Sequence, residues 1–132
     1  MLAMALAAIV AITPAAVEFP KVMRGPWGQD LAACEPEFTR GQTIRADRVT
    51  YYEGEDRIFD VTPLSAIRTP HGIGLTTIAK LRYRFHDETS TSSERLTVVG
   101  KWLYRSGSRD ALTKHFTRKN RLVRCPMGST DG

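Results

Sequence analysis

Charged side chains are missing from the first 16 residues of this chain. An apolar run from Leu2 to Ile12 is followed by the small residues of Thr13-Pro14-Ala15-Ala16. A short apolar segment that ends in small residues is typical of a secretory signal peptide, and one of about 16 residues is short for a membrane span. We therefore predict that residues 1–16 are a signal peptide cleaved after Ala15 or Ala16. An uncleaved inner-membrane anchor and a buried helix are the alternatives.

Cysteine is scarce, and the only two are Cys34 and Cys125. Neither lies in a C-x-x-C motif or has a histidine at ligand spacing, which argues against a redox or metal site. No cysteine lies directly after the apolar run, which argues against a bacterial lipoprotein. In an exported chain an even pair of cysteines predicts one structural disulfide. Closing a loop of about 90 residues would stabilise the fold by about 4–5 kcal/mol in the chain-entropy model.

Motifs of catalysis are also lacking. There is no G-x-S-x-G and no H-E-x-x-H sequence, and His71-Gly72-Ile73-Gly74 lacks the third glycine and the following helix of a phosphate-binding loop. The histidines are scattered along the chain: His71, His86 and His115. The nearest candidates for paired catalytic carboxylates lie on a predicted turn, where acidic side chains are ordinarily solvated: Glu53, Glu55 and Asp56. These absences favour a protein that is not an enzyme and that needs no metal or cofactor.

Basic charge is concentrated in the second half of the chain. Residues 17–77 carry 7 basic and 9 acidic side chains, whereas residues 78–132 carry 12 basic and 5 acidic ones. In an exported protein this bias predicts an anionic envelope component or an acidic protein as partner, before nucleic acid. The plainer interpretation is a solvated cationic sheet face that keeps the protein soluble.

The most regular pattern lies between Gly72 and Tyr104. From Ile73 to Phe85 apolar and cationic side chains alternate, and a second alternating segment follows from Leu96 to Arg105. Alternation with a period of two predicts strands with one buried face. The polar run 87–93 is expected to be the loop of the resulting antiparallel hairpin. Because aromatic and cationic residues alternate, they face opposite sides, which argues against a stacking platform for single-stranded nucleic acid.

This pattern assigns two sets of candidate residues. Those expected to fill the core or to line a ligand site are Trp27, Leu75, Leu81, Tyr83, Leu96, Val98 and Trp102. Those expected to form a cationic face are Lys80, Arg82, Arg84, Lys101 and Arg105.

The remaining chain reads as short strands separated by turns. Asp30 is expected to cap one helical turn over residues 30–34. Strands are predicted over 42–45, 49–53, 57–67 with a bend at Pro63, and 122–125. The pattern over 111–117 fits both a helix and a strand, and its residue types favour a strand. We therefore predict an all-β fold, a small antiparallel meander barrel of about 6–8 strands preceded by a signal helix. The predicted organisation is a signal peptide over 1–16, one barrel domain over 17–126 and a disordered tail over 127–132.

Several short elements carry a resemblance to known proteins: Phe19-Pro20, Arg24-Gly25-Pro26-Trp27-Gly28, Cys34, Tyr51-Tyr52-Glu53 and Arg124-Cys125. Their spacing resembles small exported proteins of proteobacteria, a group with no assigned activity. Gly25-x-Trp27 also resembles the first-strand motif of lipocalin-like (calycin-type) barrels. The resemblance implies a barrel, export and a late-strand arginine, Arg121 or Arg124, packed over Trp27.

Together these observations predict a non-enzymatic, exported protein of the cell envelope, periplasmic or secreted, that binds a protein or a small apolar ligand. Inhibition of a hydrolase is one concrete form, because periplasmic lysozyme inhibitors are similar in kind, although none of their motifs is present. The alternatives are an accessory subunit of a membrane complex anchored by residues 1–16 and, with less support, an envelope hydrolase.

Overall fold

The computed structural model describes residues 17–34, 41–52 and 54–126. The predicted signal peptide and the predicted tail lie outside these residues. Within them, the helices are too short and too polar for any to span a membrane. The helical elements are single turns: η1 (Lys21–Met23), η2 (Leu31–Cys34), α1 (Leu112–His115) and η3 (Arg118–Asn120).

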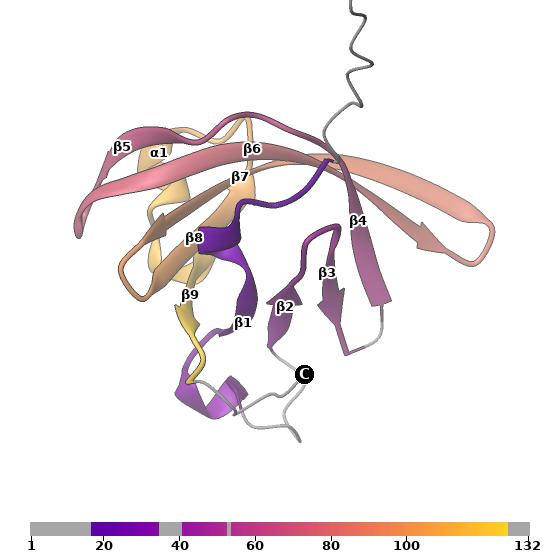
Figure 1. Ribbon diagram of the computed structural model, residues 1–132, viewed down its shortest axis with the longest axis horizontal. Helices are drawn as coiled ribbons and strands as arrows, with labels where there is room; N and C mark the ends of the chain where they lie inside the picture. The colour runs from indigo at the N-terminus through magenta and orange to yellow at the C-terminus, as the bar shows by residue number, and fades with distance from the viewer. Residues whose placement is uncertain (1–16, 35–40, 53, 127–132) are drawn as a thin grey trace, which may run out of the picture.

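Strands make up most of the described chain (Figure 1). They are β1 (Gly25–Gly28), β2 (Gln42–Ile44), β3 (Arg48–Tyr51), β4 (Gly54–Val61), β5 (Ser65–Thr69), β6 (Gly72–Phe85), β7 (Glu88–Val99), β8 (Trp102–Gly107) and β9 (Arg121–Arg124).

Eight of these strands close into an antiparallel barrel, which confirms the predicted fold class. The order around the barrel is β1-β2-β3-β4-β6-β7-β8-β9, and β9 returns to pair with β1. Strand β5 lies outside this ring. It pairs with the first part of β6, from Gly72 to Thr76, and β4 pairs with the same edge of β6 further along, from Ala79 to Tyr83. Closure gives each of the eight ring strands a partner on both sides over part of its length, whereas residues 88–93 of β7 pair with β6 alone.

The barrel interior is packed with apolar side chains from all parts of the chain. Trp27, Phe19 and Met23 are fully buried, so the lead-in to β1 plugs the barrel. The core cluster consists of Phe19, Met23, Trp27, Ile44, Val49, Ile58, Ala79, Leu81, Leu96, Val98, Leu103 and Leu122.

The predicted loop over 87–93 is wrong, because most of this run belongs to β7. Pairing continues from Leu75 opposite Val98 to Phe85 opposite Glu88, and only His86 and Asp87 form the turn. Figure 1 shows this end of the β6–β7 hairpin extending beyond the barrel. Residues 88–92 are exposed, so no buried face imposes an apolar alternation on them.

A second correction concerns the predicted strand over 96–105. The chain turns at Gly100-Lys101, and Val99 pairs with Trp102 across this two-residue connection. Gly100 has φ +56°, a conformation that glycine adopts without strain in tight hairpins. Because of this turn, the side chains that face inward are at even positions in β7 and at odd positions in β8. Two candidate residues, Trp102 and Arg105, therefore lie on the opposite face from the one predicted.

Two further predictions fail. The region 57–67 is not one bent strand: β4 ends at Val61, β5 begins at Ser65, and Pro63 lies between them. The strand predicted over 111–117 is instead the helical turn α1 with its flanking residues. The buried residue of this turn is His115. Because histidine is polar, its burial leaves no apolar periodicity in the sequence.

The predicted disulfide is present and joins Cys34 to Cys125, with a Cα–Cα distance of 5.5 Å. The helical turn beside it also matches expectation, because the carboxylate of Asp30 accepts a hydrogen bond from the backbone N–H of Ala33 at 2.9 Å. The disulfide fixes η2 against the end of β9 and indicates an oxidising, non-cytoplasmic compartment.

Candidate functional site

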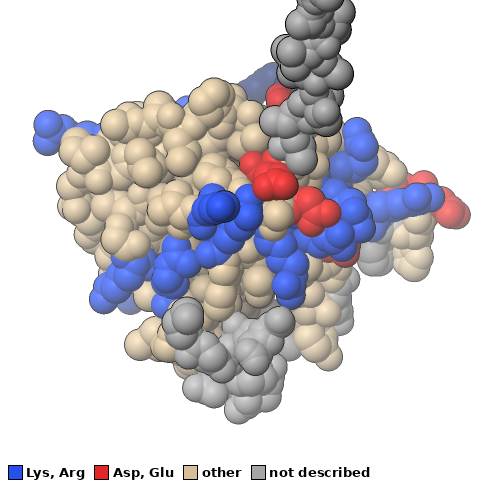
Figure 2. All heavy atoms as spheres, viewed as in Figure 1, with Lys and Arg blue, Asp and Glu red and all other residues tan. Residues whose placement is uncertain are grey.

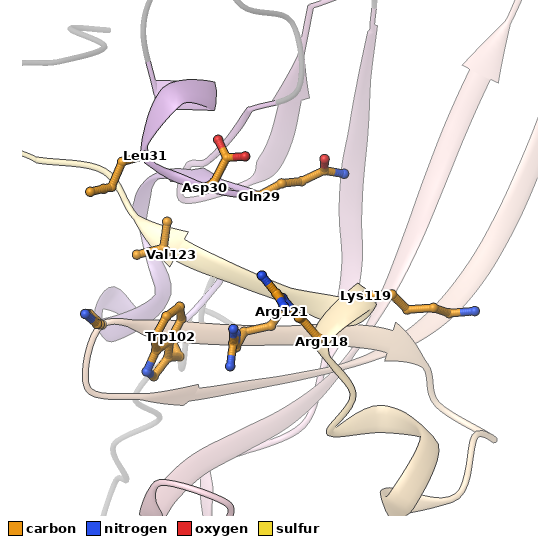
Figure 3. A pocket seen from close by; sticks show the side chains of 9 residues that line it. Gln29, Asp30, Leu31, Trp102, Arg118, Lys119, Arg121 and Val123 are labelled. Carbon is orange, nitrogen blue, oxygen red and sulfur yellow. The ribbon is translucent and has the colours of Figure 1, made fainter.

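A pocket of about 530 Å³ lies on the outside of the barrel where η2, β9 and the β7–β8 turn meet. Figure 3 shows the residues of the η2 segment on one side, Trp102 on the other and Val123 of β9 between them. The lining residues are Gln29, Asp30, Leu31, Lys101, Trp102, Arg118, Lys119, Arg121 and Val123.

The fold builds this pocket from segments that are distant in sequence. Trp102 begins β8 and pairs with Val123 of β9, so their side chains share the outer face. The Cys34–Cys125 disulfide holds η2 beside the end of β9 and thereby brings Leu31 to the pocket. The 3-10 turn η3 supplies Arg118 and Lys119 immediately before β9.

The indole of Trp102 is the centre of a cluster of cationic and aromatic groups. The guanidinium carbon of Arg121 lies 4.2 Å from its ring centroid, and the ammonium nitrogen of Lys101 lies 4.9 Å from it. His71 stacks against the same residue with a centroid distance of 5.5 Å. Cations over an indole ring are attracted by its quadrupole, so Trp102 holds two positive charges at the pocket wall.

The pocket is strongly basic. Four of its nine lining residues are lysine or arginine, and Asp30 is the one acidic residue. The carboxylate of Asp30 is engaged with η2, and in Figure 3 it points away from Trp102. Figure 2 shows Lys and Arg side chains in a band that crosses the visible face and includes the β8–β9 end, whereas the Asp and Glu side chains on this face lie away from that end. An anionic group therefore finds a complementary site here.

A polar network lies further along the same outer face, between α1, β7 and β8. The ring of His115 is fully buried and makes hydrogen bonds at both nitrogens, to Thr97 Oγ1 at 2.9 Å and to Ser106 Oγ at 2.6 Å. Burial, helped by the nearby charge of Arg95 and opposed by Asp110, lowers the pKa of His115 to about 4. The ring is therefore neutral at pH 7 and fastens α1 to β7 and β8.

The Ser106–His115 contact has the geometry of a nucleophile and its base, but its surroundings differ from those of a catalytic pair. The second nitrogen of His115 is bonded to the hydroxyl of Thr97 and not to an orienting carboxylate. A pKa near 4 is also well below the value that suits a general base at neutral pH. The contact is best explained as packing of α1.

A second polar cluster lies inside the barrel, around Arg105. Its guanidinium makes two bonds to the carboxylate of Glu94, with Nη2 to Oε2 at 3.0 Å, and a third to Asp56 at 3.4 Å. It also bonds the amide oxygen of Gln42 and lies over the ring of Tyr51. Burial disfavours the charged guanidinium, but the bonds to Glu94 outweigh this effect and raise the pKa of Arg105.

Tyr51 completes this interior cluster by donating its hydroxyl to Asp56 at 2.7 Å. Burial and the bond to that carboxylate raise the pKa of the Tyr51 phenol. The exposed fractions of the side chains are 11% for Arg105, 14% for Asp56 and 18% for Glu94. The groups bind one another, so the cluster joins β2, β3, β4, β7 and β8 across the interior.

The expected core residues divide into three groups. Trp27, Leu81, Leu96 and Val98 belong to the packed core. Tyr83 is half-buried and lies against Gly54, whereas Leu75 is 38% exposed beyond the core. Trp102 does not lie in the interior: it is on the outer surface, because the turn at Gly100-Lys101 reverses the facing of β8.

The expected cationic face is not a single surface. Lys80, Arg82 and Arg84 are exposed on the outside of β6, as predicted. Lys101 lies in the β7–β8 turn at the Trp102 pocket. Arg105 is the clear error, because the same reversal of β8 places it inside the barrel against two carboxylates.

Sequence reasoning missed Arg118 and Lys119 and assigned Arg121, as one of two candidates, to Trp27, whereas the structure places Arg121 over Trp102. The only signal for Arg118 and Lys119 was a predicted turn with a dense run of basic residues before the last strand. The described residues contain no group of His, Cys, Asp and Glu that could hold a metal ion. Comparison of the chain with family models, with curated proteins and with solved structures found no match.

Proposed function

We propose that this is a non-enzymatic, exported protein of the cell envelope, periplasmic or secreted, that binds an acidic partner protein through the Trp102 pocket. The observation that carries the proposal is the pocket itself: Trp102 with Arg121 and Lys101 at its ring, and two further cations at the rim. The disulfide supports a location outside the cytoplasm.

A protein partner suits this pocket better than a small apolar ligand does. Trp and Arg are the residues that most often dominate binding energy in protein interfaces. Leu31, 61% exposed at the rim, adds apolar contact area beside the cations. An acidic side chain or a terminal carboxylate of the partner would enter the basic pocket while Leu31 packs against its flank. An inhibitor that occupies an acidic surface of a hydrolase would bind in this way.

The proposal is tested by capture from the native envelope with two variants of equal net charge. Arg118→Gln/Lys119→Gln removes two cations from the pocket, and Arg45→Gln/Arg68→Gln removes two exposed cations elsewhere. Quantitative mass spectrometry compares the proteins retained by each variant and by the wild type. We expect one acidic protein to be depleted by the pocket variant alone. Equal retention by all three proteins would contradict the proposal.

A further inference from the structure

A second surface feature lies on the outer face of β4, β6 and β7, around Phe59. Two pockets, of about 570 and 530 Å³, share Phe59 as a lining residue and therefore adjoin at this residue. Phe59 is 36% exposed, and the guanidinium carbon of Arg82 lies 4.7 Å from its ring centroid. Arg82 lines the smaller of the two pockets only, so the two compartments that adjoin at Phe59 have different linings.

One compartment is rich in arginine. Arg57, Arg82 and Arg84 line it together with Phe59. Successive outward side chains on a strand are spaced by roughly 7 Å, so Lys80, Arg82 and Arg84 form a regular row of positive charge along β6. Arg57 is paired with Glu55 at 2.9 Å and Lys80 with Asp60 at 4.0 Å. Within the described part of the chain, Arg82 and Arg84 have no carboxylate at ion-pair distance.

The other compartment is rich in hydroxyl groups. Thr91, Ser92, Ser93 and Ser108 line it, and two cations, Lys80 and Arg109, stand at its rim. Its one acidic residue, Asp110, is paired with Lys114 at 3.7 Å. Hydroxyls that donate and accept hydrogen bonds suit the hydroxyl groups of a sugar, and an aromatic ring offers an apolar surface to the C–H face of a sugar ring.

We propose that this face, named here the Phe59 face and made of the two compartments, binds an anionic polysaccharide. The row on β6 meets successive anionic groups along the polymer, Phe59 packs against one sugar ring, and the hydroxyl-rich compartment bonds the next residue. The site differs from the Trp102 pocket in position and in lining, so it adds a second partner to the proposed function. Single-stranded nucleic acid fits less well, because such sites stack successive bases on several aromatic rings, and this face has one.

Isothermal titration calorimetry on the full-length protein tests the proposal. The probes are a hexameric oligogalacturonate, a sulfated hexasaccharide of the same length, neutral maltohexaose and an oligo-dT of similar charge. We expect binding of at least one anionic oligosaccharide at low ionic strength and no binding of maltohexaose. The carboxylated and sulfated probes decide which anionic group is preferred. Absence of binding to both, or tighter binding of oligo-dT, would overturn the assignment.

Substitutions test whether the anionic oligosaccharide binds on the Phe59 face. We expect Arg82→Gln/Arg84→Gln to weaken binding by about tenfold, since two exposed ion pairs are lost. Phe59→Leu removes the ring while keeping an apolar side chain, and should weaken binding several-fold without changing the salt dependence. The matched control is Arg118→Gln/Lys119→Gln, which lowers net charge equally at the other pocket and should leave affinity within about twofold. Equal losses in both double variants would mean that binding follows net charge and not this site.

The same two double variants separate this inference from the proposed function. Capture of the acidic partner should depend on Arg118 and Lys119 and not on Arg82 and Arg84, whereas polysaccharide binding should show the opposite dependence. Thermal unfolding of each variant verifies that these exposed substitutions leave the fold intact.

Discussion

The guanidinium carbon of Arg124 lies 4.2 Å from the centre of the Trp27 ring, at the point where β9 pairs with β1 and closes the barrel. The same guanidinium donates hydrogen bonds to the backbone carbonyls of Arg24 at 2.9 Å and Val22 at 2.7 Å. The indole N–H of Trp27 in turn donates to the carbonyl of Met23 at 2.9 Å. Arg124 therefore holds the segment that precedes β1 against the buried side chain of Trp27.

Replacing Arg124 with methionine tests how much these contacts of Arg124 stabilise the barrel. Arg124→Met keeps an apolar stem but loses the cation–π contact and two hydrogen bonds to carbonyls. We expect the free energy of unfolding to fall by about 2–3 kcal/mol. Arg121→Met is the matched control, because it removes the guanidinium from the partly exposed Trp102, and it should cost less than about 1 kcal/mol. Urea denaturation of both variants measures the difference, and equal losses would contradict this role of Arg124.

Removing Arg105 should destabilise the barrel far more than removing a surface cation. Arg105→Met leaves Glu94 and Asp56 largely buried without their partner. Breaking a buried ion pair from one side costs about 3–5 kcal/mol. The double variant Arg105→Met/Glu94→Met should be more stable than the single one, because one of the unpaired carboxylates is gone. If denaturant unfolding gave the double variant the lower stability, the cluster would not be the coupled unit described here.

The disulfide should contribute much of the stability of this small domain. Cys34 and Cys125 are 91 positions apart, and the chain-entropy model assigns a closed loop of that size about 4–5 kcal/mol. Cys34→Ala/Cys125→Ala should lower the free energy of unfolding by that order. It should also weaken capture of the acidic partner, because η2 is no longer held beside β9. A variant with unchanged unfolding midpoint in urea would refute this role.

Stability should fall in mildly acidic solution because of His115. The pKa of His115 is about 4 in the fold, against an ordinary value of 6.5. The unfolded chain therefore binds a proton that the folded chain excludes, and stability is lost as pH falls from 6.5 to 4. The loss should reach about 3 kcal/mol. In His115→Gln the side chain stays neutral, so the free energy of unfolding should change less between pH 6.5 and 4. If this variant kept the same pH dependence as the wild type, His115 would not be its source.

Much of the fold was accessible from the sequence because one face of each ring strand is buried. The alternation of apolar and polar residues predicted β6 and the end of β7, and together with the turns it predicted a barrel. The pair of cysteines predicted the disulfide. The exposed part of β7 has no buried face, so its Ser/Thr run resembled a loop. In α1 the side chain that docks the turn is His115, held by polar bonds that leave no apolar period in the sequence.

The site was harder to predict because its location depends on a single turn. Gly100 lies in a run of alternating residues, and extending the alternation through it assigned Trp102 to the interior and Arg105 to the surface. The two-residue turn reverses both assignments. The other parts of the Trp102 pocket come from η2 and η3, and only the closed barrel and the disulfide bring these segments together.

Photo-crosslinking in the native envelope tests the central claim most directly. A photoreactive amino acid replaces Leu31 at the rim of the Trp102 pocket in one variant and Tyr52 in another, since both residues are well exposed, at 61% and 73%. Our account predicts that Leu31 forms a covalent adduct with an acidic protein, that Tyr52 does not, and that Arg118→Gln/Lys119→Gln suppresses the adduct. No adduct from Leu31, or the same adduct from both positions, would contradict it.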